Sequence, residues 1–204
     1  TTWMRKITNQ TLLKLPRDRR QPRVIVSVAP VFLLVSSVLQ NLVRAASGDL
    51  DSTFGSLGKV TRPLPGANDE ARGTAIQNDG KIVVVGSDGN DFTLARNNTN
   101  GSLDGSFGTA GKAATDFFGG VDEAFAVVID STGKIIAGGF ATRTTGTTTH
   151  TDFALARYDL NGSLDTTFGV NGKVATDFFI NNDQVYALAV HSTDGLLAAG
   201  RAFN

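Results

Sequence analysis

The sequence predicts an all-β fold made of repeated four-stranded antiparallel sheets. The first observation behind this prediction is an 18-residue segment, 152–169 (DFALARYDLNGSLDTTFG), which recurs at 91–108 as DFTLARNNTNGSLDGSFG. Its second half occurs a third time at 48–55 (GDLDSTFG). The second observation is that short apolar runs, separated by glycine-containing turns, connect these copies. A segment that returns at a regular offset marks a fold built from stacked units.

Residues 1–47 differ in composition from the rest of the chain. They hold eight basic residues and a single acid, Asp18, whereas the remainder holds 11 basic and 18 acidic residues, so a net charge of zero conceals +7 followed by −7. An uncharged apolar run at 24–39 follows the basic residues, and the small residues 45–47 come just before the first repeat. This order is typical of a secretory signal peptide, so we expect cleavage within the small-residue stretch and a secreted or cell-surface bacterial protein.

Two alternatives for this segment remain open. It could stay uncut as a membrane anchor, although Pro30 and a short apolar core suit a membrane-spanning helix poorly. The pair Arg19 and Arg20 also resembles a twin-arginine signal. Apart from this segment, no membrane association is expected.

The repeats that follow begin at Gly48, Gly101 and Gly162, and the second is eight residues longer than the first. All of the extra residues fall within 139–151, around a threonine-rich stretch. One localised insertion in an otherwise continuous alignment is expected of true repeats. We therefore predict that residues 48–204 consist of three repeats, of which the last is truncated: 48–100, 101–161 and 162–204.

Each repeat is expected to contribute four short strands. The first strands are 59–64, 112–118 and 173–179; the second are 71–77, 124–130 and 185–191; the third are 81–86, 134–139 and 196–200; the fourth are 91–97 and 152–158. Glycine-containing turns separate the second strand from the third, since glycine tolerates the positive φ that tight hairpins require.

The composition of these strands predicts how the sheets pack. A sheet with one solvated face should alternate apolar and polar residues, but residues 124–129 (AFAVVI) and 81–86 (KIVVVG) are apolar on both faces. No helical pattern separates the strands, so another sheet must cover each face. Four-stranded antiparallel sheets packed face to face around an axis form a β-propeller, which typically closes with about four to eight blades. We therefore expect an open arc of about two to three blades, completed by the rest of its own propeller or by self-association.

The repeat also resembles a known family. The pattern GSLDxxFGxxGKxxTDF, then DEAxAVxxxxxGKIxxxG, then DFALARY resembles the delta-60 repeat of bacterial proteins, over about residues 48–204. The resemblance implies a β-propeller architecture. It implies no defined active site.

The LDxxFG element supplies one aspartate to each repeat: Asp51, Asp104 and Asp165. On one hypothesis these carboxylates are calcium ligands on one rim of the propeller. On the other they are turn residues that accept hydrogen bonds from nearby backbone N–H groups. A calcium site requires about six to eight oxygen ligands, and no DxDxDG-like cluster supplies them. The leucines and phenylalanines of this element are expected to pack between neighbouring sheets: Leu50, Phe54, Leu103, Phe107, Leu164 and Phe168.

Two further sets of charged residues recur. Arg96 and Arg157 lie in the fourth strand and are expected to pair with a carboxylate of the sheet such as Asp116 or Asp177, with anion binding as the alternative. Paired carboxylates, as glycosidases use, occur as Asp69-Glu70 and Asp122-Glu123, with Asp183 in the third repeat. An element present in every repeat is a poor candidate for a single catalytic site, so a structural role at the start of the second strand is favoured.

Several chemistries are not expected. The chain has no cysteine, which excludes disulfides, thiolate catalysis and zinc–cysteine sites. His150 and His191 have no histidine or cysteine partner at ligand spacing, so neither is predicted to bind metal or to act as an acid or base. No cofactor-binding motif occurs, and the acidic repeat region argues against nucleic acid. Tyr158 and Tyr186 are explained by core packing or by contact with a partner.

The insertion in the second repeat is the feature that breaks the pattern. Insertions in repeat proteins map to loops, often on the binding face. We expect either a contact loop or a flexible loop without function. Its polar residues are Thr142, Arg143, Thr144, Thr145, Thr147, Thr148 and Thr149.

Together these observations favour an exported, non-enzymatic propeller module that serves as a scaffold or interaction surface for a protein or carbohydrate. One alternative is a carbohydrate-active hydrolase or lyase whose site lies in other blades. Another is a calcium-dependent adhesion module.

Overall fold

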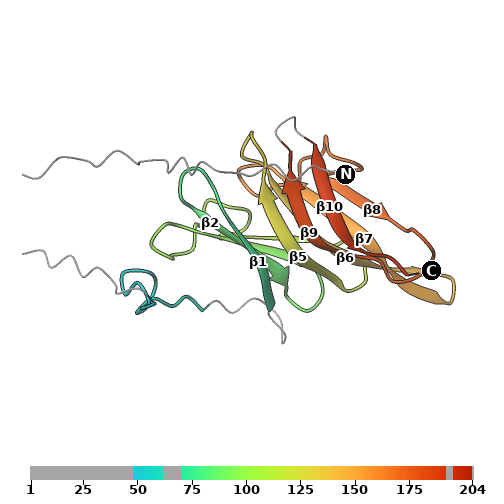
Figure 1. Cartoon of the computed structure of the whole chain (residues 1–204), viewed down its shortest axis with the longest axis horizontal. Helices are drawn as coiled ribbons and strands as arrows, with labels where there is room; N and C mark the ends of the chain where they lie inside the picture. The colour runs from blue at the N-terminus through green and yellow to red at the C-terminus, as the bar shows by residue number, and fades with distance from the viewer. Residues whose placement is uncertain (1–47, 62–69, 192–194, 204) are drawn as a thin grey trace, which may run out of the picture. The chain divides into compact units, whose positions relative to one another are not determined.

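A computed structural model describes residues 48–61, 70–191 and 195–203, all within one unit of the chain, and the predicted signal segment lies outside them. The described residues form ten strands and no helix (Figure 1), so the predicted all-β class is confirmed. Accordingly, this part of the chain contains no helix of the length and apolar character needed to cross a membrane.

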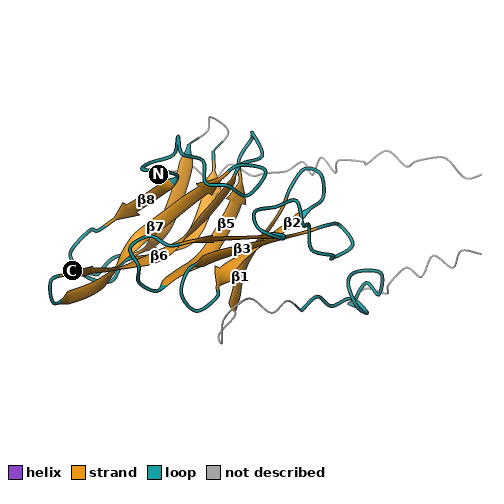
Figure 2. Ribbon diagram, turned by 180° about the vertical axis from the view of Figure 1, so that it is seen from behind, coloured by secondary structure: helices purple, strands orange, loops and turns teal. Residues whose placement is uncertain are grey.

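The strands form three antiparallel sheets in which neighbours in sequence are neighbours in space (Figure 2). The first sheet contains β1 (Glu70–Ile76), β2 (Ile82–Ser87), β3 (Phe92–Asn97) and β4 (Lys112–Thr115). The second contains β5 (Asp122–Ile129), β6 (Ile135–Thr145), β7 (Thr148–Tyr158) and β8 (Lys173–Thr176). The third contains β9 (Gln184–Val190) and β10 (Leu196–Arg201).

The sheets and the sequence repeats are out of phase. β4 lies in the second repeat, yet it pairs with β3 of the first, with Phe92 opposite Thr115 and Leu94 opposite Ala113. β8 of the third repeat pairs with β7 of the second in the same way. The expectation that the first strand of each repeat belongs to that repeat's own sheet is therefore wrong. The cause is the LDxxFG segment, which folds back against the end of β3 through the hydrogen bond from Asp104 N to Arg96 O (2.8 Å) and returns the chain alongside it.

The three sheets pack against one another through their first strands and their apolar faces. Figure 1 shows β1, β5 and β9 running side by side, and β5 contacts both of its neighbours. The middle sheet is consequently covered on both faces, as its two-sided apolar strands predicted. Backbones approach closely here: a Cβ on Gly73 of β1 would lie 2.9 Å from the carbonyl oxygen of Phe125 in β5.

Buried side chains of the first two sheets form one core between them. Its largest fully buried members are Tyr158, Phe92, Phe107, Leu94, Ile135, Val83 and Val85. Phe107 of the LDxxFG element lies against Gly162 of the next repeat, where a Cβ would be 2.9 Å from its ring. Phe54 has the same relation to Gly101. These phenylalanines therefore pack between repeats, as expected, whereas Leu50 is exposed.

The first strand of each sheet, β1, β5 or β9, carries a β-bulge. The pairing register shifts between Ala71 and Gly73 in β1, and corresponding shifts occur at Phe125 in β5 and at Tyr186 in β9. The bulges stack their side chains across the three sheets: the Arg72 guanidinium lies 5.7 Å from the Phe125 ring, which stacks on Tyr186 at 5.7 Å. The sequence explained Tyr186 equally well by core packing and by contact with a partner. In the structure it is half-exposed at the end of this stack.

The bulge explains a glycine requirement that can be tested. A Cβ on Gly139 of β6 would lie 1.8 Å from the carbonyl oxygen of Glu123, so Gly139→Ala forces the β5–β6 backbone apart. We expect a loss of at least about 2 kcal/mol in the free energy of unfolding, measured by denaturant titration. Gly105→Ala is the matched control, because a Cβ there meets nothing within 4 Å, and it should change stability by less than about 1 kcal/mol. Equal effects of the two substitutions would contradict the argument.

A buried hydrogen bond joins the first two sheets. The hydroxyls of Tyr158 in β7 and Thr115 in β4 lie 2.7 Å apart, and burial raises the pKa of Tyr158. Tyr158→Phe leaves the Thr115 hydroxyl unsatisfied, so we expect it to cost about 1–2 kcal/mol of unfolding free energy. Tyr186→Phe removes an exposed hydroxyl bonded to Gln184 and should cost less than about 0.5 kcal/mol. If Tyr158→Phe leaves the free energy of unfolding unchanged, the inter-sheet hydrogen bond contributes nothing to stability.

Candidate functional site

The charged residues that recur in the repeats form an ion-pair cluster beside the second and third LDxxFG elements. In the first sheet, Asp104 Oδ2 accepts from Arg96 Nε at 2.7 Å and from Lys81 Nζ at 2.9 Å. Asp104 Oδ1 accepts from the backbone N and the hydroxyl of Ser106 at 3.1 and 2.6 Å. The hydrogen bonds from Ser106 and Lys81 hold the pKa of Asp104 well below its usual value. Both carboxylate oxygens are thus used within the protein.

The second sheet repeats this cluster. Asp165 Oδ2 accepts from Arg157 Nε and Lys134 Nζ, both at 2.7 Å, and Thr167 takes the place of Ser106. Hydrogen bonds from Lys134 and Thr167 lower the pKa of Asp165. In each sheet the guanidinium also lies 4.6 Å from the ring of the LDxxFG phenylalanine, Phe107 or Phe168. These contacts fix the loop that returns the chain to the sheet.

The arginine partners differ from those expected. Arg96 and Arg157 pair with Asp104 and Asp165, not with Asp116 or Asp177. The LDxxFG loop causes this difference, because the backbone N of its aspartate donates a hydrogen bond to the carbonyl oxygen of the arginine eight residues earlier. The aspartate side chain is thereby held next to that arginine.

The three calcium candidates are not brought together. Asp51 accepts from the backbone N and hydroxyl of Thr53, so all three LDxxFG aspartates form the same turn. Within residues 48–61, 70–191 and 195–203, the two groups of acidic or histidine ligand atoms that converge within 4.8 Å include none of them.

The first of those two groups consists of carboxylates alone: Asp91, Asp116 and Asp122. Asp122 is fully buried, and its two oxygens accept from the backbone N of Phe117 at 2.8 Å and of Thr142 at 3.0 Å. Burial raises the pKa of Asp122 to about 6, with repulsion from the neighbouring aspartates in the same direction. Its sequence neighbour Glu123 is instead paired with Arg72 at 2.7 Å. The predicted carboxylate pair therefore serves two separate structural contacts.

The corresponding position in the second sheet is changed by the insertion. The threonine-rich residues continue β6 and β7 as a two-stranded ribbon, paired from Thr142 opposite Thr151 to Thr145 opposite Thr148. The expectation of a loop is therefore wrong. β-branched threonines favour extended strands, and the hydroxyls of Thr144 and Thr149 lie 3.0 Å apart across the ribbon.

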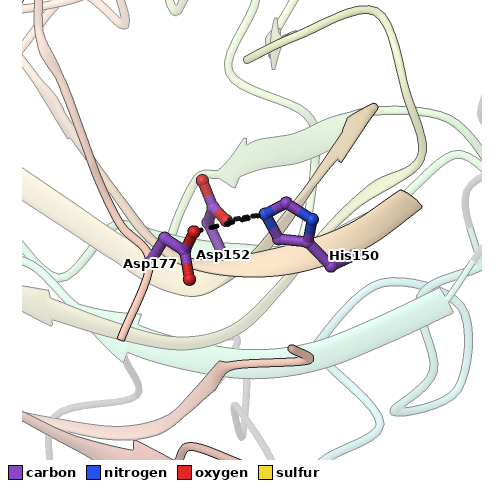
Figure 3. Close-up of side chains that lie close together, drawn as sticks. All are labelled: His150, Asp152 and Asp177. Carbon is purple, nitrogen blue, oxygen red and sulfur yellow. Dashed lines mark ion pairs between the residues drawn. The ribbon is translucent and has the colours of Figure 1, made fainter. Parts of the chain in front are cut away.

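The base of the ribbon brings two nitrogen-bearing side chains to a buried carboxylate. Arg143 and His150 face each other across the ribbon. Arg143 Nη2 lies 2.6 Å from Asp152 Oδ2, and His150 Nε2 lies 3.2 Å from Asp152 Oδ1. His150 Nε2 also lies 3.5 Å from Oδ2 of Asp177, which follows β8 (Figure 3). Burial raises the pKa of Asp152, and the Arg143 and His150 charges oppose that shift.

His150 was predicted to have no metal or acid–base role because no histidine or cysteine lies at ligand spacing. The structure instead surrounds it with two carboxylates, Asp152 and Asp177. Part of this was visible in the sequence, since residues two apart on a strand share a face. Asp177 was not, because it follows β8, a strand that the next repeat contributes to this sheet. His191 lies at the exposed end of β9, outside this cluster.

The buried carboxylate at Asp122 predicts a pH dependence of stability. Its pKa of about 6 in the folded protein exceeds the ordinary value of 3.8, so its contribution to stability is present below pH 4 and is lost as the pH rises through 6. We expect Asp122 to lower the free energy of unfolding by about 2–3 kcal/mol between pH 4 and pH 7.

Denaturant titrations across this pH range, with Asp122→Asn and the exposed Asp79→Asn as variants, measure the effect. The slope should be reduced only in Asp122→Asn. An unchanged slope in that variant would contradict the assignment.

One comparison with known proteins agrees with the fold. Residues 77–107 and 131–168 match the family described as "Domain of unknown function (DUF5122) beta-propeller". The first matched segment extends from the end of β1 to the LDxxFG element, and the second covers the same part of the second repeat. No curated protein matches the chain. The match supports the propeller repeat that the delta-60 resemblance implied, and the four-stranded antiparallel sheets agree with a β-propeller fold.

Proposed function

We propose that this chain is an exported bacterial β-propeller module that acts as a non-enzymatic interaction surface, and that the β6–β7 ribbon makes the contact. The observation that carries the proposal is the contrast between the two complete sheets. The charged residues that recur in both, such as Arg96 with Asp104 and Arg157 with Asp165, are used in internal ion pairs. The ribbon has no counterpart in the first sheet, where the pairing of β2 with β3 extends only to Ser87 opposite Phe92.

The ribbon tip has the properties of a contact surface. Residues 144–149 are all exposed and uncharged, and five of these six are threonines. β5 pairs with β6 only as far as Ala141, and β8 pairs with β7 only from Phe153 onwards. Beyond these points the ribbon has two strand edges, and an unpaired strand edge can add an extended segment of a partner. The proposed partner is therefore a protein in extended conformation, with a carbohydrate bound by the threonine hydroxyls as the alternative.

The outer faces of the arc support a scaffold role. Leu197 of β10 is 62% exposed and Ile76 of β1 is 70% exposed. Ile82, Val84 and Ala95 line an open hollow on the first sheet. Apolar surface of this kind is covered in a closed propeller by the next blade. We propose that further blades of the same kind, or a second copy of the chain, cover these faces.

The contact role is tested by shortening the ribbon. Replacing residues 144–149 with Asn-Gly keeps Arg143 and His150 opposite each other and removes the threonine tip. The wild-type chain should bind members of an extended-peptide library or a glycan array, and the shortened variant should lose that binding at least tenfold. Asn78→Ser, at the exposed tip of the β1–β2 hairpin, is the control and should bind as the wild type does.

Equal binding by the shortened variant would refute the ribbon as the contact. Turnover of a bound glycan would replace the proposal with the carbohydrate-active alternative. Export is tested separately by fractionating cells that express the full chain. Recovery in the medium or at the protease-accessible surface is expected, and recovery in the cytoplasm would refute it.

A further inference from the structure

We propose that His150, Asp152 and Asp177 bind a divalent transition-metal ion at the base of the β6–β7 ribbon. The inference is independent of the contact role proposed for the ribbon tip. It rests on the spacing of three donor atoms, on the burial of two of them without hydrogen-bond partners, and on the chemistry of the donor set.

The spacing of the donor atoms fits a metal ion. His150 Nε2 lies 3.2 Å from Asp152 Oδ1 and 3.5 Å from Asp177 Oδ2, and the ligand atoms all lie within 4.8 Å of one another. Two ligands at about 2.0–2.1 Å from a tetrahedral zinc ion are about 3.3–3.4 Å apart. The side chains converge from β7 and from the loop after β8 (Figure 3), so two separate elements hold them in place.

The second, independent observation is that two of these donors, His150 and Asp152, are buried and lack hydrogen bonds. His150 is 5% exposed and Asp152 is fully buried. Neither nitrogen of His150 has a hydrogen-bond partner, and neither does Asp152 Oδ1. His150 Nε2 thus lies close to the carboxylate oxygens of Asp152 and Asp177, but not in the orientation of a hydrogen bond. A buried polar group left in this way is costly, and a bound ion is one of the recognised explanations.

Arg143 is compatible with the site. Its guanidinium is held beside Asp152 Oδ2 and over the ring of Phe118 at 4.2 Å, which leaves Oδ1 facing His150. Asp183 occupies the position that corresponds to Asp122, and its Oδ1 is buried without a hydrogen-bond partner. The side chain of Asp177 is 30% exposed, so an ion can enter from solvent.

The donor set selects the class of metal. Calcium and magnesium take oxygen ligands, whereas an imidazole nitrogen with carboxylates suits zinc, cobalt and similar ions. The corresponding cluster of the first sheet provides an internal comparison. It contains Asp91, Asp116 and Asp122 but no histidine, and backbone N–H groups occupy both oxygens of Asp122.

The test uses the full chain without a histidine tag, freed of metal by a chelator. Titration with Zn²⁺ by calorimetry should give one binding event per chain, and Co²⁺ should give the visible absorption of a low-symmetry site. His150→Gln and Asp177→Asn should each weaken Zn²⁺ binding at least tenfold. Asp91→Asn and His191→Gln should leave it unchanged. Zn²⁺ should raise the melting temperature of the wild type and not that of His150→Gln.

Asp177→Asn keeps the proposal testable if His150→Gln does not fold, because the amide can still accept the hydrogen bond that Asp177 Oδ1 receives from Ile180 N. Absence of Zn²⁺ binding would overturn the proposal. So would binding that survives both cluster substitutions, or binding that Asp91→Asn or His191→Gln abolishes. Preference for Ca²⁺ over Zn²⁺ would overturn the assignment of metal class.

Discussion

The pairing of β3 with β4, and of β7 with β8, is the constraint on which the rest of the structure depends. Each pair joins the last long strand of one repeat to the first short strand of the next. The LDxxFG loop must therefore fold back over its own strand, which places Asp104 and Asp165 on Arg96 and Arg157. The same pairing places Asp177 beside the base of the ribbon. The inter-repeat ion pairs, the core and the histidine cluster all follow from one shared strand.

The fold was accessible from the sequence because its evidence is local and repeated. Two-sided apolar runs such as residues 81–86 require cover on both faces, and the absence of helical patterns in the sequence leaves other sheets to supply it. The offset between repeats and sheets could not be predicted from the sequence, because residues 112–115 fit equally well as the first strand of a new sheet. The partner of Arg96 depended on that offset. The extended ribbon was missed because its threonines were read as a polar loop and not as strand formers.

The two complete sheets also show how one arrangement of carboxylates acquires different surroundings. Asp91, Asp116 and Asp122 correspond to Asp152, Asp177 and Asp183 in the next repeat. In the first set, burial and mutual repulsion favour the protonated form of Asp122. In the second, burial also raises the pKa of Asp152, but the ribbon adds the charges of Arg143 and His150, which oppose that rise. An insertion of eight residues has thus added two nitrogen-bearing side chains to a cluster of carboxylates that recurs in both repeats.

The shared strand has a consequence for how such a protein can change in length. When recombination removes one whole repeat from a tandem gene, the first strand of the following repeat takes the place of the lost one. A four-stranded sheet next to the deletion keeps its fourth member, because the second and third repeats each supply the same LDxxFG turn and a matching short strand, Lys112–Thr115 or Lys173–Thr176. Gain or loss of a whole repeat therefore leaves the strand pairing of the adjoining sheets unchanged.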